Sequence, residues 1–147
     1  MNEEVKSGIL GLRTGSNVAY VASVDGEGYP QIKCMLVLEH GSAQVQWFST
    51  NFSSKGVRHF LKNPKASVYY CDEVQFKGAL FTGEMEVRTD YDARAFLWRD
   101  GFEMYYPKGV NDEDYCVLKF TADKVNYYHG LHNETISIKE LCDETDW

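Results

Sequence analysis

The segment between positions 33 and 55 holds the side chains best suited to bind an anion. A helix is expected to begin near Ser54, so free backbone N–H groups and the positive end of the helix dipole would meet there. A phosphate dianion favours such donors together with positive charge. The alternative is that the serines only cap the helix and the lysines lie on the surface. Four hydroxyls and two ammonium groups are available for such a site: Ser49, Thr50, Ser53, Ser54, Lys33 and Lys55.

Three strands joined by short turns are expected to position this segment. Residues 18–24, 30–39 and 43–47 are rich in β-branched or alternating apolar residues and are separated by Gly-containing turns. The apolar run 35–38 predicts a strand buried on both faces. The alternation of Ala43, Val45 and Trp47 predicts a half-buried strand with these three residues inward. The three strands would form an antiparallel meander.

The pattern after position 50 changes to helical and back to strand. A capped helix is expected from Ser53 or Ser54 to the Asn63-Pro64 stop. A second short helix is expected to begin at Thr89-Asp90, to run to about Trp98 and to bury Phe96 and Leu97. Further strands are predicted over 66–71, 75–88, 116–120 and 125–128, with Gly78 and Gly83 marking bulges or bends.

These elements predict a mainly β fold. About seven strands and two short helices without a βαβ rhythm favour a closed or partly open antiparallel barrel. We expect one domain over 1–147, with a core of about 15–129 and a C-terminal tail of 130–147. The tail has a weak helical signal at 138–141, and part of it is expected to be loose.

Composition excludes several classes of protein. The 147 residues carry a net charge of −7 and a pI near 5.0, which argues against nucleic-acid binding because phosphate neutralisation needs a basic face. No export signal and no apolar run of about 18 residues occur, so a cytoplasmic protein without a membrane span is expected. The four cysteines match no zinc pattern and are expected to be reduced. The spacing of His129 and His132 lacks further ligands, so no metal site is expected.

The order of motifs resembles one known superfamily. A DGxG-type turn, "PQIKCML", "VQWFSTNFSSKGVRHFLKNPKASVYYCD" and "FTGEMEVRTD" follow one another along the chain. This order resembles the FMN-binding split β-barrel superfamily of pyridoxamine 5′-phosphate oxidase-like proteins, in particular small members related to general stress protein 26. The resemblance covers about residues 15–129 and implies a Greek-key-like split barrel.

The resemblance also implies a cofactor and its ligands. FMN would be the cofactor, with its phosphate held by Thr50, Ser54 and Lys55, with Ser49 nearby. Lys33 stands where many members have arginine, and Cys34 replaces a common proline. The backbone of Met35 and Leu36 would lie along the isoalloxazine ring, with Trp47 or Phe48 as an apolar wall. Such proteins pair barrel to barrel, so the chain would form a homodimer with flavin at the interface, and the partner chain would contribute Gln75, Lys77 and Trp98.

The implied function is an FMN-dependent oxidoreductase of unknown substrate, with a reduced nicotinamide as a possible electron donor. The arginine-containing C-terminal segment of true pyridoxamine 5′-phosphate oxidases is missing, since no arginine follows Arg99. Vitamin B6 oxidation is therefore not expected. No side chain stands out as a general acid or base, so the catalytic residues stay unassigned. The alternative is a non-catalytic sensor module that binds flavin, deazaflavin or haem on the same scaffold.

Overall fold

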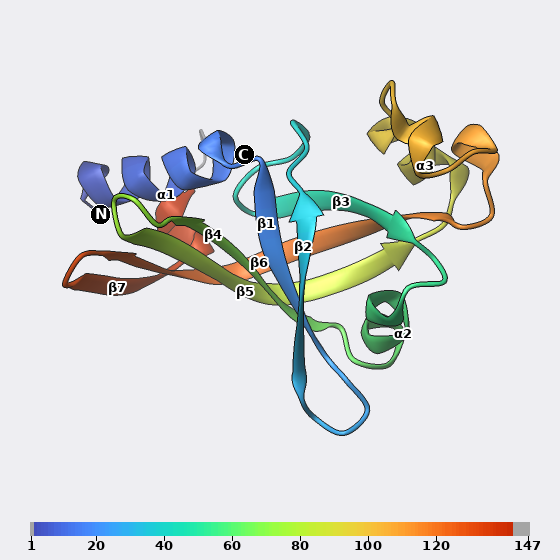
Figure 1. The fold of residues 1–147 in the computed structure, drawn as a ribbon. Helices are drawn as coiled ribbons and strands as arrows, with labels where there is room; N and C mark the ends of the chain where they lie inside the picture. The colour runs from blue at the N-terminus through green and yellow to red at the C-terminus, as the bar shows by residue number, and fades with distance from the viewer. Residues whose placement is uncertain (1, 143–147) are drawn as a thin grey trace.

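Seven strands form one antiparallel sheet that curls without closing, as in a split barrel (Figure 1). The structure is a computed structural model and describes residues 2–142. The strands are β1 (Val18–Val24), β2 (Pro30–Leu36), β3 (Val45–Asn51), β4 (Lys65–Asp72), β5 (Lys77–Arg88), β6 (Tyr115–His129) and β7 (His132–Ser137). The helices are α1 (Glu3–Gly15), α2 (Lys55–Lys62), α3 (Tyr91–Leu97) and α4 (Ile138–Leu141), with 3₁₀ turns at Phe102–Met104 and Gly109–Asn111.

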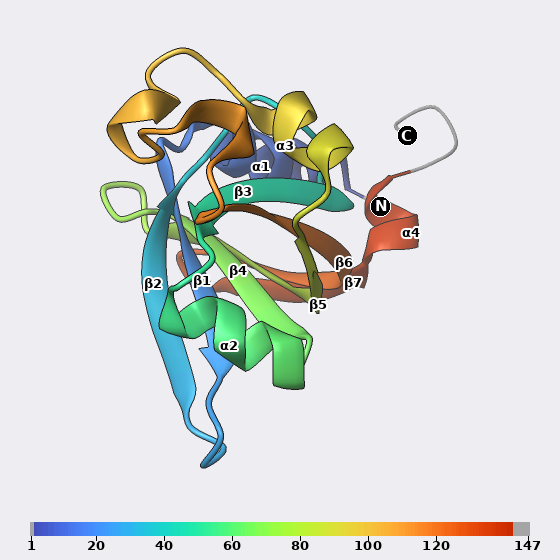
Figure 2. The same cartoon turned by 90° about the vertical axis from the view of Figure 1, so that its right-hand side faces the viewer.

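The sheet order is β2-β1-β4-β5-β6-β3, and β7 also pairs with β6. β6 is one strand of 15 residues whose first half pairs with β3 and whose second half pairs with β7. β2 and β3 stand at the two ends of this order and approach each other without pairing. The barrel is therefore split between β2 and β3, and α2 lies beside this split (Figure 2).

A bulge at Gly83 lets β5 follow the curve of the sheet. The register between β5 and β6 shifts at Thr82 and Gly83, as expected for this glycine. A Cβ at Gly83 would lie 2.0 Å from the backbone oxygen of Thr121, so only glycine fits. Gly78 instead lies in regular pairing, where it makes room for the rings of Tyr69 and Tyr128.

Two hydrophobic clusters hold the molecule together. The larger one fills the sheet interior with residues such as Phe48, Phe81 and Phe120, which are at most 1% exposed. The smaller one includes Leu97 of α3, Phe102 of the first 3₁₀ turn and Tyr106, and these pack against Tyr115 and Val117 of β6. No helix within residues 2–142 has the length and apolar character that a membrane crossing requires.

The structure corrects the expected boundaries of the core. The helix α1 was not predicted, yet its residues Val5, Ile9 and Leu12 are buried in the larger cluster. β7 was also missed, and the strands predicted at 116–120 and 125–128 are parts of β6. The weak helical signal at 138–141 is confirmed by α4, whose Ile138 and Leu141 are buried. The core is thus wider than 15–129; the end of the tail, 143–147, lies outside the described residues.

Two predictions about the burial of strands were wrong. β2 is not buried on both faces, because it is an edge strand; of its residues only Met35 is buried. In β3 the fully buried side chains are Gln46, Phe48 and Thr50 rather than the Val45 and Trp47 face. Gln46 can be buried because its amide donates to the Ala43 carbonyl and accepts from the Tyr70 hydroxyl.

The α3 helix begins one residue later than its predicted box. Its N-cap is Asp90, whose carboxylate accepts the Ala93 N–H at 3.1 Å. Leu97 is buried as expected, whereas the ring of Phe96 is 48% exposed and packs edge-on against His40 and Trp47.

Candidate functional site

A cavity of about 740 Å³ lies where the sheet is split, between β1, β2, β3 and the start of α2. We call it the α2 pocket. Its polar side is formed by Lys33 from β2, Thr50 from β3, and Ser54 and Lys55 at the start of α2. Its apolar wall includes Val21, Ile32, Met35, Phe60 and Leu118.

The side-chain direction along β2 explains why Lys33 and Met35 reach the pocket. Gln31, Lys33 and Met35 share one face of β2 and line the pocket, whereas Cys34 and Leu36 on the alternate face do not; Ile32, also on the alternate face, is the one residue of that set that contributes to the lining. On β3, Thr50 lines the pocket and is buried. Both strands end the sheet order, so curling of the sheet brings their inner faces together.

The start of α2 is held in place by two sets of hydrogen bonds. Ser54 caps the helix by accepting the Val57 N–H, and its own N–H donates to the Asn51 carbonyl. Asp114 accepts from the Ser53 N–H at 2.8 Å, the Ser53 hydroxyl at 3.1 Å and the Asn51 amide at 2.9 Å. The Ser53 N–H is the main reason why the pKa of Asp114 lies below its ordinary value. A loop before β6 therefore positions the helix terminus.

The acidic run 112–114 is thus more than a solvated loop. Asp112 is buried, and its carboxylate accepts the N–H groups of Lys108 and Asp114. The Asp114 N–H is the main cause that lowers the pKa of Asp112.

The hairpin between β1 and β2 supplies the outer end of the pocket. The Asp25 carboxylate accepts from the backbone N–H groups of Tyr29 and Glu27 and from the Gln31 amide, each at 2.9 Å. The Tyr29 N–H is the main cause that lowers the pKa of Asp25. The carboxylate is therefore held in place as a charged group at this end of the pocket.

The structure brings together half of the ten predicted site residues. Lys33, Met35, Thr50, Ser54 and Lys55 line the α2 pocket. The side chain of Leu36 is on the outer face of β2, and Ser49 is on the opposite face of β3 from Thr50, near Tyr106. Burial is the main cause that raises the pKa of Tyr106 to about 12. Trp47 and Phe48 are also absent from the pocket lining.

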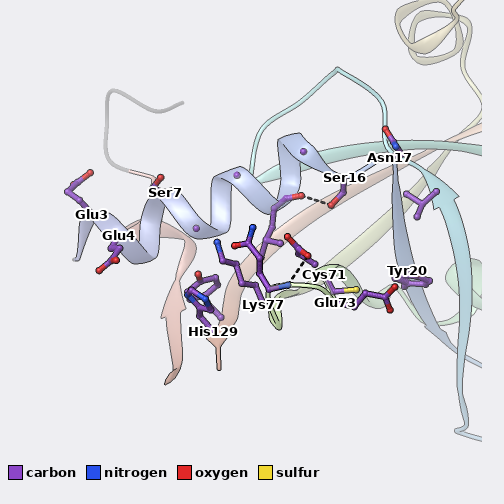
Figure 3. Close-up of a pocket in the computed structure, with 18 residues that line it drawn as sticks. Glu3, Glu4, Ser7, Ser16, Asn17, Tyr20, Cys71, Glu73, Lys77 and His129 are labelled. Atoms are coloured by element: carbon purple, nitrogen blue, oxygen red, sulfur yellow. Dashed lines mark hydrogen bonds between the residues drawn. The ribbon is translucent and has the colours of Figure 1, made fainter. Parts of the chain in front are cut away.

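Two more of the predicted residues lie in a different cavity. Gln75 and Lys77 line a groove of about 1050 Å³ between α1 and the ends of β1, β4, β5 and β6, which we call the α1 groove. Figure 3 shows Lys77 beneath α1, with His129 and Cys71 along the same groove. Within one chain, these residues are therefore separated from the α2 pocket.

Trp98 lies in neither cavity. Its ring packs against Phe102, Tyr106 and Tyr115 at centroid distances of 5.4 to 6.4 Å. Any contact of Gln75, Lys77 or Trp98 with a ligand in the α2 pocket would have to come from a second copy of the chain.

The α2 pocket residues that sequence reasoning missed include a hydrogen-bonded pair, Ser23 and His59. The Ser23 hydroxyl lies 2.8 Å from His59 Nδ1, and both line the pocket. The spacing of four residues between Lys55 and His59 is the signal that places both on one helix face. Among residues 2–142, no three His, Cys, Asp or Glu side chains gather as a metal site requires.

Within residues 2–142, none of the four cysteines forms a disulfide. Burial is the main cause that raises the pKa of Cys116 to about 12, so this thiol stays protonated near neutral pH. Cys34 is exposed on the outer face of β2, away from the α2 pocket lining.

Comparisons with known proteins agree with this architecture. A family model described as Pyridoxamine 5′-phosphate oxidase matches residues 1–129. A crystal structure of a protein related to general stress protein 26 (pyridoxinephosphate oxidase family) from Clostridium acetobutylicum is 37% identical. It covers 96% of this chain and 99% of that one, with a TM-score of 0.88.

More distant structures share the fold. The general stress protein 26 of Bacillus anthracis str. Sterne is 17% identical, with a TM-score of 0.75 over 91% of this chain and 98% of that one. A heme binding protein from Mycobacterium smegmatis is 14% identical, with a TM-score of 0.70 over 93% of this chain and 58% of that one. No curated protein matches the sequence.

Proposed function

Because the chain belongs to the pyridoxamine 5′-phosphate oxidase family, we propose that it binds FMN in the α2 pocket and acts as an FMN-dependent oxidoreductase. The observation that carries this proposal is the meeting of Lys33, Thr50, Ser54 and Lys55, from three separate elements, around the start of α2. Residues far apart in the sequence thereby offer two cations and two hydroxyls to one anion.

The chemistry of this donor set fits a phosphate monoester. The first-turn N–H groups of a helix have no acceptor within the helix, so those of Lys55 and Gly56 are available. Lys33 and Lys55 add positive charge from opposite sides of the split, and Asp25 is engaged in its hairpin. Lysine in place of arginine at position 33 gives a point charge rather than a two-pronged contact.

The rest of the pocket fits an apolar ring system. Val21, Met35 and Leu118 form a wall next to the polar end. Bound FMN would supply the electron transfer that ordinary side chains do not provide. The residues of this chain would bind the phosphate, orient the ring against β2 and exclude water from one of its faces. A reduced nicotinamide is the electron donor we propose.

We further propose that two copies of the chain form the complete site. The outer face of the sheet exposes apolar side chains on neighbouring strands, including Ile32 (71% exposed), Leu36 (51%) and Tyr20 (40%). In the β1–β2 register, Val18 pairs with Leu36, Tyr20 with Cys34 and Ala22 with Ile32, so the exposed residues form one continuous face. A second copy covering this face would bury it. Sedimentation of wild type against Leu36→Asp, on the same face but outside the pocket lining, tests this: dimer is expected for the first and monomer for the second.

A non-catalytic haem-binding or sensor role is the second candidate. The observation that favours it is the imidazole of His59 in the α2 pocket, since imidazole is a haem ligand. The paired lysines and hydroxyls favour FMN instead, because they match a phosphate. A haem-like absorption band near ~410 nm after haem addition, without retention of FMN, would favour the second candidate.

The proposal is tested by loading the full chain with FMN, desalting it and recording the visible spectrum. Flavin bands near ~450 and ~375 nm should remain with the wild-type protein, and they should be bleached by NADH or NADPH.

Lys55→Ala should weaken FMN binding about tenfold by removing one charge-assisted contact. Lys62→Ala, at the exposed end of the same helix, should leave binding unchanged. Loss of flavin on desalting the wild-type protein, or equal binding by both variants, would refute the FMN site. Retained flavin that no nicotinamide reduces would support the sensor role.

A further inference from the structure

The outer end of the α2 pocket holds a histidine–serine pair beyond the phosphate-binding residues considered so far. His59 follows Lys55 by one turn of α2, and both side chains line the pocket. The imidazole Nδ1 lies 2.8 Å from the hydroxyl of Ser23 on β1. Ser23 is only 6% exposed, so this contact fixes the ring in one orientation.

The hydrogen bond to Ser23 leaves Nε2 as the second polar atom of the imidazole ring. Among residues 2–142, no group forms a hydrogen bond with Nε2. Since His59 lines the α2 pocket, a pocket ligand is the natural partner for this nitrogen. The Ser23 hydroxyl can accept from a protonated Nδ1, so the same geometry serves the charged imidazole.

The charges that face His59 come from three places. Lys55 is on its own helix, Lys33 is on β2, and Asp25 is in the β1–β2 hairpin. The Asp25 carboxylate already accepts three hydrogen bonds within the hairpin. On the other side of Ser23, Lys65 and Glu84 line a separate groove on β4 and β5. The Asp25 carboxylate keeps its charge and interacts electrostatically with His59, so two lysines and one carboxylate surround the imidazole within the pocket.

We propose that His59, positioned by Ser23, is a third cationic ligand of the flavin phosphate and takes up a proton when the phosphate binds. This inference rests on the proposed FMN site. A phosphate dianion beside the ring adds negative charge, which favours the protonated imidazole. The imidazole takes one proton from the solvent, and nothing is oxidised or reduced. FMN binding therefore depends on pH in the range where histidine titrates.

The experiment compares wild type with His59→Gln by measuring FMN dissociation constants at pH 6.0 and pH 8.5. His132→Gln, an exposed histidine on β7, is the matched control. At each pH, the dissociation constant of the variant is divided by that of the wild-type protein, so titration of the phosphate itself cancels in this ratio. The His59→Gln protein should bind FMN roughly tenfold more weakly at pH 6.0 and less than twofold more weakly at pH 8.5. Riboflavin, which lacks the phosphate, should show no difference between the proteins.

Calorimetry supplies a second readout that a purely structural role would not change. Titrating FMN near pH 7 in two buffers of different ionisation enthalpy gives the number of protons taken up. This number should be larger for the wild-type protein than for His59→Gln. Ser23→Ala should lie between them, because the ring is present but no longer oriented.

The outcomes separate the two proposals. If FMN binds but the His59→Gln ratio is the same at both pH values, or equally large with riboflavin, the histidine is structural and the inference is wrong. Equal proton uptake by the two proteins would overturn it as well. If wild type binds no FMN at either pH, the proposed function fails, and the inference fails with it.

Discussion

Replacing Asp114 with alanine should loosen the start of α2 from a distance. Asp114 belongs to the loop before β6 and does not line the α2 pocket, yet it accepts three hydrogen bonds from Asn51 and Ser53. These two residues lead directly into Ser54 and Lys55. The side chain therefore acts on the predicted phosphate site only through the loop that it holds.

The magnitude follows from the number and exposure of these bonds. Buried hydrogen bonds to a charged group contribute about 1.5–3 kcal/mol each, but this carboxylate lies at the surface and is screened by water. About 0.5 kcal/mol for each of the three contacts gives a loss of roughly 1–2 kcal/mol in the free energy of unfolding. The pocket would also lose its preformed geometry, so FMN should bind about tenfold more weakly.

The pKa shift gives this prediction a pH dependence. The pKa of Asp114 is lowered from its ordinary value of 3.8, chiefly by the Ser53 N–H. When the pKa of a carboxyl group is lower in the folded protein than in the unfolded chain, the ionised group stabilises the fold at pH values above the unfolded-state pKa. This contribution is lost as the pH falls through the folded-state pKa. The stability difference between wild type and Asp114→Ala should therefore be full at pH 7 and shrink below about pH 4.

Urea unfolding at pH 7 and at pH 3, with FMN titration at pH 7, measures both effects. Glu113→Ala is the neighbouring control, because Glu113 is exposed and its side chain makes none of these contacts. Should Asp114→Ala match this control in stability and FMN affinity, the reasoning about the loop would be refuted. A stability difference that persisted at pH 3 would show that the charge is not its source.

Two further predictions concern the sheet that positions the pocket. Gly83→Ala should destabilise the protein by about 3 kcal/mol or more, because the added Cβ would meet backbone atoms of Thr121. Thermal unfolding should show a lower midpoint for this variant. Gly11→Ala, which has open space around the added Cβ, is the control and should show no such decrease. Tyr70→Phe should cost about 1–3 kcal/mol, because it leaves the buried Gln46 oxygen without its donor. Burial raises the pKa of Tyr70 to about 12, so wild type should lose stability as pH rises from about 10 towards 12, and the Tyr70→Phe protein should lose less.

Local patterns in the sequence were sufficient to predict most strands and the helix α2. Alternation and turn residues place β1, β2 and β4 within a few residues of their observed bounds. The helix α1 was missed because three glycines interrupt its apolar face. β6 was divided in two because its polar middle, around Asp123 and Lys124, is typical of a turn, while neighbours on both sides keep it extended.

The residues that we propose as anion ligands were likewise named from the sequence. Hydroxyls and a lysine at an expected helix start already predict a phosphate site, because donors and positive charge are properties of the residues themselves. The chemistry of Thr50, Ser54 and Lys55 was thus available without the structure. Their assignment to FMN still rests on the resemblance and stays a proposal.

Only the tertiary structure decided which distant residues meet. Local periodicity does not say which face of a strand is covered, since that depends on what packs opposite. For this reason the sequence alone misjudged β2, which is an edge strand, and the buried face of β3. Curling of the sheet brings Lys33 to Lys55 and Ser23 to His59, and the loop before β6 brings Asp114 to Ser53. These meetings are long-range contacts, and the order in which the strands pair determines them.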